Sequence, residues 1–153
     1  MSTTTIESSR FGALQIEREA IIEFPLGLIG LGGSRYALVD RNPGSGFQWL
    51  HSLEELTLAL PVIDPRRFFS EFAPRVAAED LEQIGVEELS SAELLVTVRA
   101  TPDPADITVN LRAPLVVWEG RGYQVINTAP NASLQALLFA PAVDSGQPAV
   151  DAA

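Results

Sequence analysis

The sequence predicts a mostly β fold in one small domain. The chain has 153 residues, of which 46% are hydrophobic, and this length and composition fit a single domain with a core of its own. Short apolar segments of strand length recur along the chain with turn residues between them. Internal repeats and low-complexity blocks are absent from the sequence. These observations favour a compact β-rich fold, with one or two short helices, over alternating βαβ units.

The first strands are expected in the N-terminal half. Alternating apolar residues predict a strand around Leu14 and Ile16, a turn at Arg18-Glu19 and a returning strand at Ile22 to Phe24, which together would form a hairpin. The next strands are expected at 36–39, 47–52 and 56–63, with a turn cluster at 42–46.

Three further strand regions follow in the C-terminal half. Leu94, Val96 and Val98 alternate with more polar residues and predict a strand that ends before Thr101-Pro102. Ile107, Val109 and Leu111 predict a half-buried strand over 107–112. The segments 116–118 and 123–126, joined by the turn 119–122, predict a hairpin.

Helix is expected at two places only. Asp64 followed by Pro65 has the form of an N-cap with proline at the first helical position. Ala77, Leu81 and Ile84 fall on one face of a helix that Gly85 would end, with acidic residues in its early part, where the helix dipole favours them.

Composition limits the function classes. Ten arginines oppose twenty acidic residues, so the net charge of −10 argues against direct binding to nucleic acid. The absence of cysteine excludes disulfides, thiolate zinc sites and thiol nucleophiles. The N-terminus lacks the pattern of a signal peptide, and apolar runs stay well short of the roughly 20 residues of a spanning helix, so a soluble cytoplasmic protein without a membrane partner is expected. Residues 1–9 are expected to be a flexible N-terminus, 10–141 a single β-rich domain, and 142–153 a flexible C-terminal tail.

An asparagine and a proline interrupt the strand pattern between Ile107 and Trp118. Pro114 has no N–H to donate to a ladder, so it marks an edge, a bend or the start of a strand. The amide of Asn110 can satisfy backbone groups that such a bend leaves open, and this interpretation is preferred to a contact with a ligand.

The same segment resembles a known family. Thr108 to Pro114 is similar to the T-x-N-L-x-A-P signature of the flagellar assembly factor FliW family. Five other pieces follow the family's order, and the resemblance runs from about residue 10 to residue 135. These pieces are F-G-x-x-x-I at 11–16, I-x-F-P-x-G-L at 22–28, D-P-x-x-F-F at 64–69, Q-V at 124–125, and W-L-Q-S, to which Trp-Leu-His-Ser at 49–52 is similar.

The resemblance implies a small β-barrel-like domain that binds proteins and has neither enzymatic activity nor a cofactor. It implies two partners, the RNA-binding translational repressor CsrA and newly made flagellin, with flagellin able to release CsrA. Such a protein would act in the cytoplasm as a regulator of flagellum assembly, and it is expected to be a monomer when free.

Two segments are candidate binding surfaces. Residues 71–93 hold seven acidic residues against Arg75 alone, and this segment is either a solvated helix face or a surface for a basic partner. Its candidate contact residues are Glu79, Asp80, Glu82, Glu87 and Glu88. Asn110, Arg112 and Pro114 are the candidates of the second segment, where a strand edge left open by the proline would receive flagellin.

Two alternatives remain open at this point. A small hydrolase would need a pocket with two carboxylates of separated pKa, and His51 and Glu54-Glu55 are the candidate groups, although a hydrogen-bonded His in the sheet and a solvated turn are the preferred interpretations. A carbohydrate-binding or structural module would expose Trp49, Trp118 and Tyr123 as a stacking platform. Gly30 to Gly33 lacks the spacing of a phosphate loop and is expected to be a turn.

Overall fold

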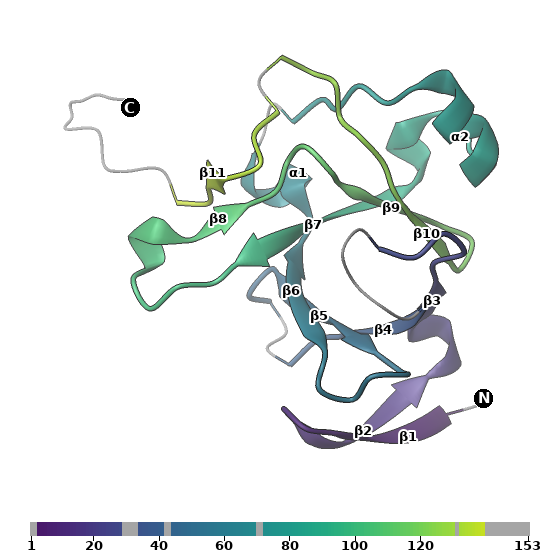
Figure 1. Ribbon diagram of the computed structural model, residues 1–153, viewed down its shortest axis with the longest axis vertical. Helices are drawn as coiled ribbons and strands as arrows, with labels where there is room; N and C mark the ends of the chain where they lie inside the picture. The colour runs from purple at the N-terminus through teal and green to yellow at the C-terminus, as the bar shows by residue number, and fades with distance from the viewer. Residues whose placement is uncertain (1–2, 29–33, 42–43, 70–71, 131, 140–153) are drawn as a thin grey trace.

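The computed structural model describes residues 3–28, 34–41, 44–69, 72–130 and 132–139 (Figure 1). The expected flexible tail at 142–153 and the expected turn at Gly30–Gly33 lie outside these ranges. The strands are β1 (Thr3–Ser8), β2 (Gly12–Glu17), β3 (Ile21–Glu23), β4 (Arg35–Val39), β5 (Phe47–Ser52), β6 (Ala59–Ile63), β7 (Glu93–Arg99), β8 (Thr108–Val109), β9 (Leu115–Trp118), β10 (Arg121–Gln124) and β11 (Ala136–Leu137). The helices are α1 (Pro65–Phe68) and α2 (Ala78–Ile84), and 3-10 turns lie at Arg18–Ala20, Leu89–Ser91 and Pro104–Asp106.

Within the described ranges, seven strands close into a barrel. Their order is β7, β6, β5, β4, β3, β10 and β9, and β9 pairs with β7 to complete the ring (Figure 1). Neighbouring strands are antiparallel except at β3 and β10, where Glu23 and Arg121 form a parallel pair. Closure removes the open sheet edges that would otherwise pair with other chains. The predicted mostly β, barrel-like fold with one or two short helices is confirmed.

Large apolar side chains fill the barrel. Phe24, Tyr36, Leu50 and Leu115 are completely buried and belong to one cluster. The rings of Phe24 and Tyr36 meet edge to face with centroids 5.6 Å apart. Gly122 lies directly beside this pair, because a Cβ atom added to it would come within 2.3 Å of the Phe24 ring. The interior is therefore closely packed on the side of β10, and only glycine fits there.

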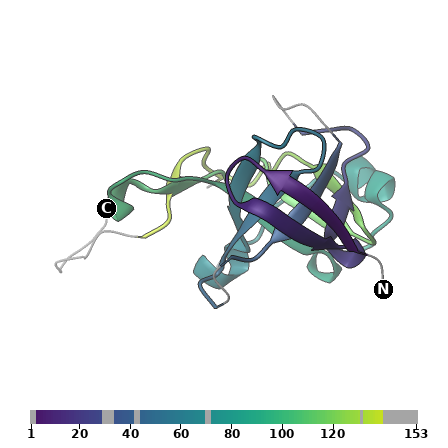
Figure 2. The same cartoon turned by 90° about the horizontal axis from the view of Figure 1, so that it is seen from below.

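The N-terminal residues differ from expectation. Thr3–Ser8 forms strand β1, which pairs along its whole length with β2, so the prediction of a flexible segment over 1–9 is wrong for these residues. The predicted hairpin between Leu14 and Phe24 is also wrong, because β3 pairs with β4 and β10 and not with β2. The β1–β2 hairpin lies across the outside of the barrel (Figure 2), where Ile6 and Ile16 are buried against it.

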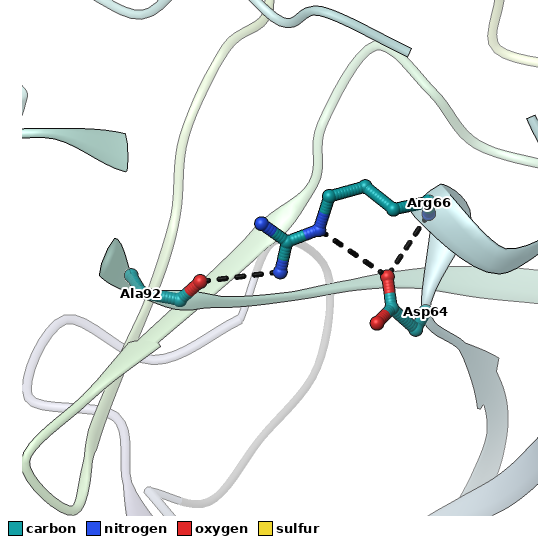
Figure 3. A network of polar contacts seen from close by, with 3 residues as sticks. All are labelled: Asp64, Arg66 and Ala92. Carbon is teal, nitrogen blue, oxygen red and sulfur yellow. Dashed lines mark hydrogen bonds and ion pairs between the residues drawn. The ribbon is translucent and has the colours of Figure 1, made fainter. Parts of the chain in front are cut away.

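Helix α1 begins where the sequence predicts. The Oδ1 atom of Asp64 accepts a hydrogen bond from the backbone N–H of Arg66 at 2.9 Å, and Pro65 is the first helical residue. The Arg66 side chain continues from this cap, with its Nε atom 3.5 Å from the same carboxylate oxygen and its Nη2 atom donating to the carbonyl of Ala92 at 3.2 Å (Figure 3). These contacts fix the start of α1 beside the start of β7.

Helix α2 also forms where predicted, and Gly85 ends it in the left-handed conformation at φ 89°. Its inner face contributes Ile84 to an apolar cluster on the outside of the barrel, together with Leu94, Val116 and Tyr123. Glu79 and Glu82 of α2 are exposed, and Asp80 is half-buried.

Strands β8 and β11 extend the sheet beyond the barrel. β8 pairs with the end of β7, and β11 pairs with β8. We call this extension the arm, and in both views it leaves the barrel on the side away from α2 (Figures 1 and 2). The predicted strand over 107–112 is shorter than expected, because only Thr108–Val109 is strand and the chain turns at Asn110.

Candidate protein-binding surfaces

A groove of about 660 Å³ lies at the end of the barrel from which the arm leaves. Buried leucines of the barrel, including Leu28 and Leu115, form part of its wall, and Val98 and Val109 continue the wall along the arm. Its remaining lining residues are Leu60, Thr97, Arg99, Thr108, Asn110, Arg112, Ala113, Gln124, Ile126, Leu134 and Gln135. We call this feature the barrel-mouth groove. Its volume falls within the range of ligand and peptide sites, roughly 300 to 1,000 Å³.

Exposed apolar side chains line part of the groove. Ile126 is 48% exposed and Leu134 is 59% exposed, although both are large apolar residues. Leu137 and Phe139 add further exposed apolar surface on the arm and just after it. Contiguous exposed apolar side chains are typical of sites that a partner covers. Sequence reasoning missed Ile126 and Leu134, because apolar residues near the ends of strands normally indicate core.

Asn110 shapes one wall of the groove through its side chain. Its Oδ1 atom accepts hydrogen bonds from the N–H groups of Arg112 at 3.0 Å and Ala113 at 3.1 Å. This is a tight turn in which the amide replaces a backbone acceptor. The prediction that Asn110 satisfies the backbone at a bend is confirmed. Asn110 and Arg112 also line the groove, whereas Pro114 is buried and offers little surface to a partner.

The backbone between Asn110 and Pro114 is fully used within the chain. Each N–H of residues 110–113 donates internally, to the carbonyls of Thr97 and Ser133 and to the Asn110 side chain. The carbonyls of residues 111–114 all accept internally, from Asn127, Gln124 and Val125. The expectation of an open strand edge at this segment is therefore wrong. A partner that docks here would use the side-chain walls of the groove.

Asn127 is a polar residue of this region that the sequence did not single out. It is buried, and its Oδ1 atom accepts hydrogen bonds from the N–H groups of Arg75 at 2.9 Å and Ala129 at 3.0 Å. Its Nδ2 atom donates to the carbonyl of Leu111 at 3.0 Å. One amide thus ties together three segments that are distant in sequence, and it holds the segment after β10 in place beside the groove.

The acidic candidates form a second surface, on and after α2. Glu79, Glu82, Glu87 and Glu88 are exposed, and Asp80 is half-buried. We call these five residues the acidic patch. Glu79, Asp80 and Glu82 lie on α2, and Glu87 and Glu88 follow its end at Gly85. Of the five, Glu82 and Glu87 line one hollow of about 380 Å³.

An exposed leucine lies beside the acidic patch. Leu26 is 70% exposed and, with Asp80 and Gln83, lines a hollow of about 250 Å³ between α2 and the barrel. Leu28 and Gln124 line both this hollow and the barrel-mouth groove. The hollow, which reaches the acidic patch at Asp80, therefore shares a wall with the barrel-mouth groove.

The groups proposed for a hydrolase do not form a catalytic site. His51 is buried and bonded on both sides, with Nε2 2.7 Å from the Ser8 hydroxyl and Nδ1 2.8 Å from the Ser52 carbonyl. Ser8 is also buried, and its hydroxyl oxygen accepts hydrogen bonds from the N–H groups of Arg10 and Phe11. The two hydrogen bonds confirm the prediction of a hydrogen-bonded His in the sheet. Because Ser8 is buried and already bonded, its hydroxyl is inaccessible to a substrate.

Carboxylates with shifted pKa lie at the surface. Partial desolvation, and then the nearby charge of Asp64, raise the pKa of Glu93, while Arg66 opposes the shift. Hydrogen bonds from the N–H groups of Ser34 and Arg35 lower the pKa of Glu54. Both glutamates are exposed and lie outside the barrel-mouth groove, so neither belongs to a pocket with paired carboxylates.

The aromatic residues do not form a stacking platform. Tyr123 is buried, and Trp118 packs against the apolar cluster beneath α2. Trp49 contacts the edge of Phe11, and the guanidinium of Arg10 lies 5.0 Å from the centre of its ring. The arrangement that a carbohydrate-binding module would need is therefore not present at these positions.

Groups of three or more histidine or acidic side chains that could hold a metal ion were not found among the described residues. No helix of the described part of the chain is long and apolar enough to cross a membrane.

Comparison with known proteins agrees with the fold and the motifs. The family model described as FliW protein matches residues 5–138. A flagellar assembly factor FliW of Leptospira biflexa is 33% identical over 137 residues, which cover 87% of this chain and 90% of the relative. One from Geobacter sulfurreducens is 33% identical over 112 residues, covering 73% and 70%.

A solved structure is similar as well. The crystal structure of the flagellar assembly factor FliW superposes with a TM-score of 0.80 at 26% identity, covering 92% of this chain and all of that chain. The β1–β2 hairpin, the closed barrel and the arm all lie within the matched residues 5–138 or overlap them. This chain belongs to the FliW family of flagellar assembly factors.

Proposed function

We propose that this protein is a non-enzymatic cytoplasmic regulator of flagellum assembly that binds the translational repressor CsrA and binds flagellin. The observation that carries the proposal is the pairing of two unlike surfaces on one small barrel. The acidic patch suits a basic RNA-binding protein, and the barrel-mouth groove suits an apolar protein segment. Membership of the FliW family supports the role in flagellum assembly.

The acidic patch is the proposed site for CsrA. An RNA-binding protein carries basic surface, because neutralising phosphate provides much of its affinity for RNA. An acidic partner docked beside that surface adds a field that repels RNA phosphate. Leu26, exposed beside the same hollow as Asp80, would add apolar contact area to such an interface. The net charge of −10 makes direct binding of this protein to RNA unfavourable.

The barrel-mouth groove is the proposed site for flagellin. Subunits of a filament expose apolar segments before assembly, and such segments commonly dock as a helix in an apolar groove or as an added strand. The groove provides exposed apolar residues in Ile126 and Leu134. Because the backbone at 110–114 is already hydrogen-bonded, we favour docking of a helix or extended segment by its side chains over strand addition at that segment.

Titration calorimetry with CsrA from the same host tests the first part of the proposal. We expect binding at micromolar concentrations by a monomer whose circular dichroism shows a folded state, and no binding to RNA alone. Leu134→Asp should weaken binding to flagellin and leave binding to CsrA unchanged. A folded protein that gives no heat with CsrA would contradict the proposal.

A further inference from the structure

The lining of the barrel-mouth groove has the opposite charge to the rest of the molecule. The chain has twice as many acidic as basic residues, yet the lining contains Arg99 and Arg112 and neither aspartate nor glutamate. Both arginines are exposed, and neither forms an ion pair with a described residue. Two cations without carboxylates therefore border an otherwise neutral and mainly apolar groove.

The backbone holds the two arginines firmly. Arg99 is the last residue of β7 and pairs in register with Thr108 of β8. Arg112 lies in the turn that Asn110 closes, and its carbonyl accepts a hydrogen bond from the N–H of Asn127 at 2.7 Å. Only the side chains have to order when a ligand binds, and this keeps the entropic cost of binding low.

We infer that the barrel-mouth groove receives an apolar peptide segment that carries a carboxylate, and that Arg99 and Arg112 bind this carboxylate. The inference rests on the proposed function in that it takes the groove as the docking site. Arginine matches the geometry of a carboxylate with two parallel hydrogen bonds. A segment without a negative charge would leave both guanidinium groups partly desolvated and unpaired, so the arginines would select against it.

The field of the rest of the protein sharpens this selection. A net charge of −10 repels an acidic segment from most of the surface, whereas the groove attracts it. The two arginines would thereby fix where along the groove the segment lies, and the apolar wall of Val98, Val109 and Leu115 would supply the contact area.

A fluorescent probe tests the groove without any partner protein. Anilinonaphthalene sulfonate combines an apolar body with an anionic group, and Nile red is a neutral apolar control. The variant Arg99→Gln/Arg112→Gln should raise the dissociation constant of the anionic probe about three- to tenfold, as expected for exposed charge pairs. The dissociation constant of Nile red, which has no charge to pair with the arginines, should change less than about twofold in the same variant.

The matched control removes two positive charges elsewhere. Arg18 and Arg121 are exposed and lie outside the groove lining, so Arg18→Gln/Arg121→Gln changes the net charge equally. Equal weakening of the anionic probe in both double variants would overturn the inference, because net charge alone would then explain the effect. Unchanged binding in the groove variant would overturn it too. Near-ultraviolet circular dichroism checks that each variant keeps its tertiary packing.

Peptides distinguish this inference from the proposed function. A leucine-rich amphipathic peptide with two glutamates should displace the anionic probe with a dissociation constant at least about threefold lower than that of the same peptide with two glutamines. The two constants should be equal in the Arg99→Gln/Arg112→Gln variant. If flagellin binds and requires Leu134 but is indifferent to the arginines, and the two peptides bind alike, the inference fails and the proposed function stands. If the acidic peptide binds through the arginines but flagellin does not bind, the inference stands and the flagellin assignment fails.

Discussion

The Nε2 atom of His51 lies 2.7 Å from the hydroxyl oxygen of Ser8, and this contact joins strand β5 of the barrel to strand β1 of the hairpin. Nδ1 of the same ring faces the carbonyl of Ser52, which can only accept, so Nδ1 carries the proton. With that proton on Nδ1, Nε2 is the ring nitrogen at hydrogen-bond distance from the Ser8 hydroxyl. The contact is therefore a hydrogen bond between two buried side chains, one from the barrel and one from the hairpin.

Ser8→Ala should destabilise the protein by about 1 to 3 kcal/mol, the usual cost of leaving buried polar groups unpaired. The substitution removes the partner of His51 and the acceptor of two backbone N–H groups. Urea denaturation measures the loss. Ser9→Ala is the control, because Ser9 is exposed and bonds through its backbone N–H. Equal midpoints for the two variants would show that the contact does not hold the hairpin.

The strands of the barrel could be predicted because their sequences carry the signal themselves. β4 to β7 and β9 contain apolar residues at period two or in short continuous runs, with turn residues between them. β10 begins at Arg121, two residues before the strand predicted at 123–126. Strand β1 was missed, because Ile6 is the only apolar residue in Thr3–Ser8 and the strand is held by pairing with β2. Local patterns also do not determine which strands pair. β3 pairs with β4 and β10, although the sequence suggested a hairpin with β2.

The candidate site was predicted only in part for a similar reason. The turn at Asn110 could be inferred, since Pro114, four residues later, indicates a bend, and an asparagine side chain can accept hydrogen bonds from backbone N–H groups in such a bend. The groove could not be inferred, because residues far apart in sequence, such as Leu28, Arg99 and Leu134, meet there only after the barrel has closed. Asn127 escaped notice because its partners are equally distant in sequence.

Asn110→Ala should lower stability by about 1 to 3 kcal/mol, because the N–H groups of Arg112 and Ala113 lose their acceptor. Asn110→Asp keeps an acceptor oxygen at the same place and should recover most of the loss. Thermal and urea unfolding of both variants test this role. A variant with alanine that melts like the wild type but no longer binds a partner would show that the residue serves recognition instead.

The pH dependence of stability should carry a contribution from Glu54. Backbone hydrogen bonds from Ser34 and Arg35 lower the pKa of this carboxylate in the folded state. A lowered pKa gives stability that is present above the pKa of the unfolded chain and is lost as the pH falls through the folded pKa. Glu54→Gln should therefore flatten the loss of stability as the pH falls below 4.5, the ordinary pKa of a glutamate.

The control for Glu54 is its neighbour. Glu55 is exposed, and its carboxylate accepts no backbone hydrogen bond from a described residue. Urea midpoints across the acid range should follow the wild type in Glu55→Gln and deviate in Glu54→Gln. Parallel curves for all three proteins would mean that the bonds from Ser34 and Arg35 do not stabilise the charged form.

Neutralising the acidic patch should slow association with CsrA. Replacing Glu79, Glu82, Glu87 and Glu88 by glutamine removes charges from exposed side chains, so the fold should survive. The reduction should be largest at low salt and fade between about 50 and about 300 mM, as screening shortens the Debye length. Stopped-flow measurements over this range test it. Association rates that match the wild type at every salt concentration would leave the patch as a solvated face.

Flagellin and CsrA should weaken each other's binding to this protein, even though their proposed surfaces differ. The barrel-mouth groove and the hollow beside the acidic patch share Leu28 and Gln124, so a segment seated in one changes the wall of the other. A coupling free energy of about 1 to 3 kcal/mol would suffice for partner switching, and it must be the same in both directions.

Calorimetric titration of each partner in the presence of the other measures this coupling. Leu28→Ala should change this coupling, because it alters the wall that the two hollows share. Size-exclusion chromatography gives an independent result: added flagellin should release CsrA from a preformed complex. A stable ternary peak at saturating flagellin, with no released CsrA, would rule out partner switching for this protein.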